Sequence, residues 1–337
     1  MLTPFGLSAA ATQWQFAPVV TGAVALPAVL YGWGVVRVAR RHPARPWSLW
    51  RAALFGAGLL VIVIATQSGI GAYDNVLFYD HMIQHVMLLM VAPALLIGGQ
   101  PLTLLLHASR NPLHTWAKRV IRSRVASFLT WPVFGTVAYA LAVMAAHLTA
   151  IASYTEQKPA WHNGEHAAFI VIGYLFYLPI LGTEPIRWRL SYPVRFVLLI
   201  LLMPIDTFTG VALGYASAHS PGIPAGPRPG WAPSPVSDLH SGGAVMWIAG
   251  DGIMFALMMI VFLMWARNER ATVTGRSFFE RARRENLAAM VASSQAATGA
   301  TQASPPAADG RTIDDDAHLA AYNDYLARLN RQHDRTG

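Results

Sequence analysis

The sequence predicts an all-α membrane protein, a bundle of seven transmembrane helices with its N-terminus outside the cell and its C-terminus in the cytoplasm. Three observations lead to this fold class. The 337 residues are 54% hydrophobic and only 12% charged, whereas soluble domains carry about 25% charged residues. Long apolar segments recur at the length that a helix needs to cross a bilayer. The basic residues are concentrated in alternate connections between these segments.

The apolar segments set the number of predicted spans. A hydrocarbon core about 30 Å thick requires roughly 20 apolar residues in a helix. Seven segments meet this requirement, and in chain order they are residues 16–37, 52–70, 78–99, 128–150, 164–183, 195–216 and 241–265. Pro93 and Pro204 lie inside two of them, where proline removes a backbone hydrogen bond and favours a kink. The first fifteen residues contain no Lys or Arg, so we interpret the first segment as a retained span and not as a signal peptide.

Arginine and lysine predict the orientation of the bundle. The connections after the first, third and fifth spans contain thirteen basic residues, whereas those on the other side contain only Lys158 and Arg228. Because cytoplasmic loops carry the excess of basic residues, the first group of connections is predicted to be cytoplasmic. Residues 1–266 then form the membrane domain, and residues 267–337 form a cytoplasmic tail that is partly disordered and ends in an amphipathic helix.

Charge and composition exclude several classes of function. The net charge of +8 is explained by the basic cytoplasmic connections, which contact membrane lipid, so we predict no nucleic-acid partner. The chain has no Cys, which excludes disulfides, thiolate ligands and a Cys nucleophile. No phosphate-binding loop, nucleophile elbow or H-E-x-x-H zinc motif is found in the sequence. We therefore predict that the protein is not an enzyme.

Histidines gather at the predicted outer ends of the spans. Seven of the twelve lie there, on five different spans, although their separation along the chain does not require it; they are His81, His85, His147, His162, His166, His219 and His240. A single histidine at this depth is most simply an interfacial polar residue. The convergence of several on one side instead favours a metal site. We leave out His219, because its connection is rich in Pro and Gly.

Two of these histidine pairs have the same spacing, His81-x3-His85 and His162-x3-His166. Residues four apart lie on one face of a helix, so each pair can hold one metal ion, and neutral imidazole suits copper, zinc, iron or nickel. We predict a site of His81, His85, His147, His162 and His166. Neighbouring residues at the same level could orient these ligands or bind directly: Asp80, Met82, Glu165, Asp238, His240 and Met246.

Two carboxyl groups lie deeper in the predicted membrane, Asp206 in the sixth span and Asp251 in the seventh. A charge at this depth costs at least a few kcal/mol, so such residues face the bundle interior. Three alternatives remain open. The two could share a proton, they could bind a cation together with Thr207 and Thr209, or each could be protonated and hydrogen-bonded to a neighbouring helix.

These motifs resemble the CtaG family, the multi-span cytochrome c oxidase assembly factors of the bacterial plasma membrane. The resemblance covers residues 50–265. Its most specific part is "HMIQHVMLLMVAPALLIGGQPLTLLL", which is similar to the family pattern H-M-x-Q-H, A-P and L-x-x-G-x-P-L. The segments "AHLTAIASY", "WHNGEHAAFIVIGYLFY" and "DLHSGGAVMW" follow in the same order as the family blocks.

The resemblance implies a role in the maturation of a haem–copper oxidase, with copper supplied to the catalytic subunit. It extends to His81, His85, His162, His166 and Asp238. Around His147 the sequence departs from the family, since Ala146 and Thr149 stand where the family has Trp and Pro. The family also has no counterpart of His240.

Other classes of function remain as alternatives. A copper or proton-coupled transporter would use Asp206, Asp251 and the methionines that follow Asp251 on one helix face. A zinc-dependent membrane hydrolase or a haem-binding redox protein would use the same histidines. In a pure scaffold the histidines would only pack.

Overall fold

The computed structural model describes residues 3–149, 159–182, 184–217 and 228–298, and every regular element within these ranges is a helix. The helices are α1 (Leu7–Thr12), α2 (Pro18–Arg41), α3 (Leu49–Gln67), α4 (Gly69–Tyr73), α5 (Phe78–Val86), the π-helix η1 (Met87–Val91), α6 (Ala92–Gly98), α7 (Pro101–Ala108), α8 (Leu113–Ile121), α9 (Arg124–Leu129), α10 (Pro132–Leu148), α12 (Pro159–Leu181), α13 (Tyr192–Gly214) and α14 (Pro235–Thr298). The predicted all-α class is confirmed.

Six helical segments are long and apolar enough to cross a membrane. They are 18–41, 49–73, 78–108, 161–181, 192–214 and 235–270. The shorter α10, also apolar, has 17 residues and corresponds to the predicted fourth span. The protein is thus built for a membrane, while the count of seven spans and their orientation stay predictions.

The chain divides into two units, Met1–Phe262 and Leu263–Gly337. The first contains the candidate spans up to the middle of α14. The boundary falls close to the predicted start of the tail at residue 267. Lys158, His219 and the predicted terminal amphipathic helix lie outside the described residues.

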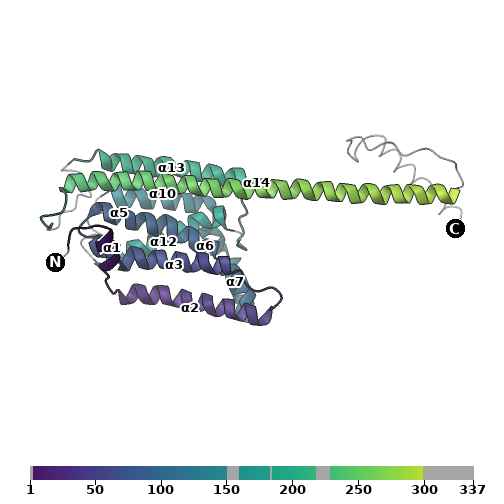
Figure 1. The fold of residues 1–337 in the computed structure, drawn as a ribbon, viewed down its shortest axis with the longest axis horizontal. Helices are drawn as coiled ribbons and strands as arrows, with labels where there is room; N and C mark the ends of the chain where they lie inside the picture. The colour runs from purple at the N-terminus through teal and green to yellow at the C-terminus, as the bar shows by residue number, and fades with distance from the viewer. Residues whose placement is uncertain (1–2, 150–158, 183, 218–227, 299–337) are drawn as a thin grey trace. The chain divides into compact units, whose positions relative to one another are not determined.

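Within the first unit, α12 packs on η1 and α6, the segments that continue α5. The helix α3 packs on α2 and α6 (Figure 1). The helix α12 also packs on α10, and α10 packs on α13. The closest approach is at Gly173 of α12, where a Cβ atom would collide with the carbonyl oxygen of Leu89 and with Pro93. Small residues allow helices this close in a membrane. The helix α12, which carries His162 and His166, therefore packs closely against η1 and α6, which follow His81 and His85 in the chain.

Two adjacent glycines let the start of α14 pack closely on its neighbours. A Cβ atom at Gly242 would collide with the ring of Phe78 on α5, and one at Gly243 would collide with the backbone of Gly210 on α13. The side chain of α14 one turn earlier, Asp238, is fully buried against the start of α5. The pair "GG" thus sets how deeply α14 sits between α5 and α13.

A carboxylate from a neighbouring segment also holds the opposite end of the third span. Glu184, which follows α12, accepts hydrogen bonds from the backbone N–H of Leu102 (3.1 Å) and of Thr103 (2.8 Å) and from the Thr103 hydroxyl (2.6 Å). The two N–H groups are among those that the first turn of α7 leaves unsatisfied. The helical path is interrupted between α6 and α7 at Gln100, which has a left-handed backbone with φ of 53°.

Candidate metal centre

Five histidines gather between three helices at the end of the bundle that carries the start of α5. The helix α5 contributes His81 and His85, the last turn of α10 contributes His147, and the first turns of α12 contribute His162 and His166. All five are between 3% and 7% exposed. The structure therefore brings the five predicted histidines together in one cluster, while their common depth in the membrane stays a prediction.

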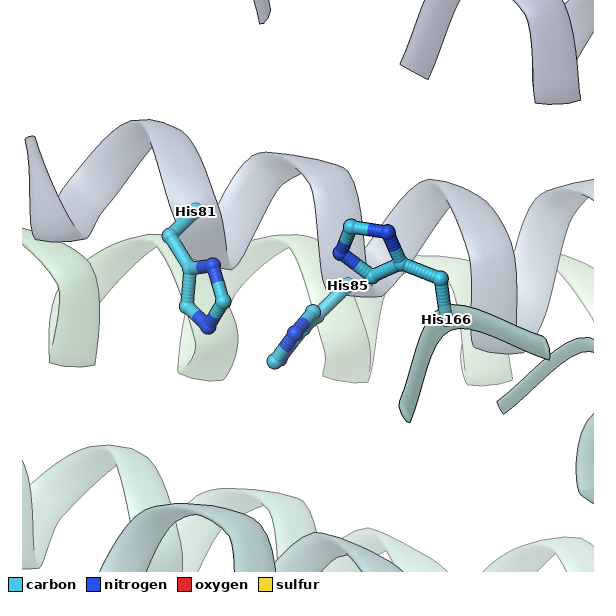
Figure 2. A group of neighbouring side chains, drawn as sticks. All are labelled: His81, His85 and His166. Carbon is cyan, nitrogen blue, oxygen red and sulfur yellow. The ribbon is translucent and has the colours of Figure 1, made fainter. Parts of the chain in front are cut away.

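The two H-x3-H pairs, one on α5 and the other on α12, face each other. Ring centroids are 3.9 Å apart for His81 and His85, 5.3 Å apart for His81 and His162, and 4.3 Å apart for His162 and His166. Figure 2 shows the rings of His81, His85 and His166, two from one helix and one from the other. One nitrogen of each of these three lies within 4.8 Å of the others, a separation that one metal ion could bridge.

A second set of ligand atoms shares His166 with the first. Asp74, His162 and His166 also place one ligand atom each within 4.8 Å of one another. Asp74 Oδ2 lies 2.9 Å from His162 Nε2. Asp74 was not among the residues predicted from the sequence. It follows the short helix α4, in the predicted outer connection before α5, and the same topology that aligned the histidines places it at their level.

A chain of hydrogen bonds determines which nitrogen of His85 is free to bind. His147 Nδ1 lies 2.7 Å from the carbonyl oxygen of Val143, which can only accept, so this nitrogen carries a proton. In a neutral ring Nε2 of His147 is then an acceptor, and it lies 3.0 Å from His85 Nδ1. His85 therefore donates from Nδ1, and its Nε2 carries a lone pair.

Buried nitrogens without hydrogen-bond partners are found in this cluster. Within the described residues, His81 Nδ1, His85 Nε2 and His166 Nε2 are buried and make no hydrogen bond. Leaving a buried polar atom unsatisfied costs about 1–3 kcal/mol, so three from one cluster need an explanation. A metal ion held by neutral imidazoles would supply the missing partner for each.

A polar cavity of about 230 Å³ adjoins the cluster. Asp74, His162 and His166 form part of its wall. Gln84, Asn75 and Asn163 add amide groups to the lining. This cavity, which we call the vestibule, offers a hydrophilic approach to the second set of ligand atoms.

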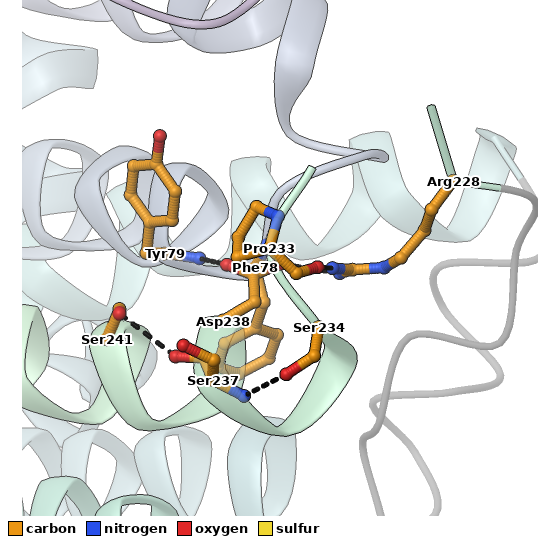
Figure 3. Close-up of polar contacts among 8 residues, drawn as sticks. All are labelled: Phe78, Tyr79, Arg228, Pro233, Ser234, Ser237, Asp238 and Ser241. Carbon is orange, nitrogen blue, oxygen red and sulfur yellow. Dashed lines mark hydrogen bonds and ion pairs between the residues drawn. The ribbon is translucent and has the colours of Figure 1, made fainter. Parts of the chain in front are cut away.

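Asp238 does not face the histidines. Its carboxylate accepts from the backbone N–H groups of Phe78 (2.8 Å) and Tyr79 (3.0 Å), at the first turn of α5, and it also accepts from Arg228 (Figure 3). Leu77, the residue at the N-cap position, provides no side-chain cap of its own. Asp238 thus caps α5 from α14 and holds the helix that carries His81 and His85.

The other predicted neighbours of the site take different positions. Asp80 is fully buried, and its carboxyl makes no hydrogen bond with the described residues. Glu165 is on α12 and partly buried. His240 Nε2 lies 2.9 Å from the carbonyl oxygen of Ala216, which engages that nitrogen away from the cluster. Met82 and Met246 line a small inner cavity next to His85.

The two intramembrane acids each have a hydroxyl partner on another helix. Tyr139 of α10 donates to Asp206, at 3.3 Å from Oδ2. Thr207 of α13 donates to Asp251 Oδ2 at 2.7 Å. The third alternative from the sequence, a hydrogen bond to a neighbouring helix, describes the contacts of both. Thr209 instead bonds the carbonyl oxygen of Ile205 within its own helix.

Comparison with known proteins identifies relatives of most of the bundle. The family model described as "Cytochrome c oxidase caa3 assembly factor" matches residues 29–268. Uncharacterized proteins of Mycobacterium bovis and Mycobacterium tuberculosis are each 29% identical over 273 residues, and one of Mycobacterium leprae is 29% identical over 266 residues. Each match covers 77% of this chain but only 40% of the relative. No solved structure matches the chain.

Proposed function

This chain belongs to the cytochrome c oxidase caa3 assembly factor family, and from that premise we propose that it binds copper in its histidine cluster and supplies it to the catalytic subunit of the oxidase. The observation that carries the proposal is the set of buried imidazole nitrogens that make no hydrogen bond, on His81, His85 and His166. In this proposal copper is a cargo that the protein receives and passes on. The protein acts in the bacterial plasma membrane and performs no catalysis.

The donor set fits copper. Three neutral imidazoles suit copper or zinc, and without Cys the protein holds no thiolate that would oxidise outside the cytoplasm. Two helices bring the ligands together: His81 and His85 share α5, and His166 is on α12, which packs against η1 and α6. Such a site is formed by packing before the metal arrives, so little ordering is needed on binding.

His147 has a different role in this proposal from the one expected from the sequence. Its two nitrogens are engaged by Val143 and His85, so it orients His85 and selects the tautomer that leaves Nε2 available. Ligating histidines commonly use their second nitrogen in this way, and loss of the partner costs about 10–100-fold in metal affinity.

The vestibule and Asp74 serve to collect the ion. A carboxylate next to His162, open to a polar cavity, attracts a cation from the aqueous side. Because His166 belongs to both sets of ligand atoms, an ion held by Asp74 and His162 needs only a short step to reach His81 and His85.

The direct test is the copper content of the purified protein. We expect the double variant His81→Ala/His85→Ala to lose bound copper, while His42→Ala, an exposed histidine outside the cluster, keeps the wild-type content. Equal copper in the wild type and the double variant would contradict the ligand assignment.

The cellular test is oxidase activity in a strain that lacks this protein. The wild-type chain should restore active oxidase, and the double histidine variant should restore less. If the double variant restores full activity, the protein is a scaffold and copper binding is not its function. Zinc without copper in the purified protein, or a haem absorption band, would support the enzyme and redox alternatives instead.

A further inference from the structure

We propose a second copper site deeper in the bundle, in which the thioethers of Met82, Met90 and Met246 hold monovalent copper. The proposal rests on the proposed function, since it gives the copper of the histidine cluster a next position. It gives Met82 and Met246, which the sequence placed beside the histidine site, a site of their own together with Met90.

The site is a small cavity directly next to the histidine cluster. Its volume is about 20 Å³, and about 10–15 Å³ is enough for one water molecule, so a single small ion fits. His85 and His147 form part of the wall. The cavity therefore begins where the histidine cluster ends.

Three buried methionines from two parts of the chain line this cavity. Met82 is on α5, Met90 is in η1 and Met246 is on α14, and they are 1%, 2% and 6% exposed. A buried water needs two to four good hydrogen-bond partners, and thioether sulfur is only a weak acceptor. Soft thioethers instead favour copper(I) over harder divalent ions.

The π-helix η1 aligns two of the methionines. An eight-residue step in an α-helix is about 2.2 turns, which would point Met82 and Met90 in different directions. The wider coil of η1, which ends at Val91, takes more residues per turn and brings the step closer to two whole turns. Both side chains consequently reach the cavity.

Met246 reaches the cavity because α14 packs closely on α5 and α13. Gly242 and Gly243 let α14 approach α5 and α13 closely, and Met246 lies one turn further along the same helix. A larger residue at either glycine would hold Met246 away from Met82. The glycine pair therefore has a direct consequence for the proposed site.

A carboxyl group in the cavity wall can balance the charge of the ion. Asp206 and Tyr139 also line the cavity, and Tyr139 donates to Asp206. A lone cation in a membrane interior costs several kcal/mol. One carboxylate neutralises one monovalent ion, whereas a divalent ion would keep a net charge.

The three sets of ligands form a graded series. The vestibule provides a carboxylate and imidazoles, the centre provides imidazoles, and the inner cavity provides thioethers. Ligand softness increases inward, which stabilises copper(I) progressively. The transfer is an exchange of ligands in which copper arrives and leaves as copper(I), so no oxidant or reductant takes part.

X-ray absorption spectroscopy of the full-length protein loaded with Ag⁺, a monovalent probe without redox chemistry, tests the inner site. We expect sulfur ligands in the wild type, and a loss of most of the sulfur signal in Met82→Leu/Met246→Leu, a swap that preserves side-chain volume. Its affinity for Ag⁺ should fall at least about tenfold. Met254→Leu, buried on α14 near Tyr177, is the control and should keep the signal.

A second pair of variants tests the cavity without changing a ligand. A Cβ atom at Gly250 would lie 3.6 Å from Cβ and 3.8 Å from Cγ of Asp206, an ordinary contact, so Gly250→Ala should fold and narrow the cavity. It should weaken the sulfur signal. Gly252→Ala meets nothing within 4 Å and should leave the signal unchanged.

The outcomes separate this proposal from the histidine site. Metal with nitrogen ligands only, together with methionine variants that match the wild type, would overturn the inner site and leave the histidine site standing. If instead His81→Ala keeps its copper while the methionine variants lose theirs, the histidine assignment fails and the inner site remains.

Discussion

His85 Nδ1 lies 3.0 Å from Nε2 of His147, and this contact determines how His85 presents its other nitrogen. His147 donates from Nδ1 to the Val143 carbonyl, so its Nε2 accepts and His85 must donate from Nδ1. His147 therefore acts on the metal through His85.

The substitution His147→Ala should weaken copper binding without removing a ligand. We expect an affinity about 10–100-fold lower, because His85 loses the partner that fixes its tautomer. Competition titration measures the affinity, and X-ray absorption counts the nitrogen ligands. A lower nitrogen count in the variant would mean that His147 binds the metal itself.

The substitution Asp238→Ala should destabilise the protein by about 1–2 kcal/mol, because the first turn of α5 loses its cap. Unfolding of the purified protein in detergent measures this change. Copper retention should fall in parallel, since α5 carries two ligands. Ser241→Ala, exposed one turn further along α14, is the control, and equal losses in both variants would contradict the capping role.

The substitution Asp74→Asn should slow copper loading while leaving the final content of the histidine site unchanged. The asparagine preserves the shape of the vestibule wall and removes the charge that attracts the cation. Rapid-mixing kinetics at low and high salt check this, because screening should reduce the wild-type rate towards that of the variant. Asn163→Ala, in the same wall, should load at the wild-type rate.

Glu184 predicts a pH dependence of stability. Burial raises the pKa of its carboxyl above the ordinary 4.5, although the hydrogen bonds from Thr103 and Leu102 oppose this shift. The folded state therefore holds this proton more tightly than the unfolded state. The contribution of Glu184 to stability is full below pH 4.5 and is lost as the pH rises through the folded pKa.

The measurement is the unfolding midpoint of the wild type and of Glu184→Gln across acidic and neutral pH. The difference between the two proteins should change with pH above 4.5, because glutamine does not titrate. A constant difference would show that the proton on Glu184 is not linked to folding.

Local patterns in the sequence predicted the helical membrane class and the members of the histidine cluster. Long apolar segments leave a helix as the simplest spanning structure, and the x3 spacing places each histidine pair on one face of its helix. Both features depend only on residues close together in the chain. The predicted depth of His147 followed from the length of its span alone.

The contacts between helices were decided by the tertiary structure. The sequence does not give the rotation of one helix against another, and that rotation sends Asp238 to the cap of α5, Asp74 to His162 and His147 to His85. It also gathers Met82, Met90 and Met246 around one cavity. These relationships depend on close packing at Gly173 and at Gly242 with Gly243, where the absence of a side chain lets distant segments meet.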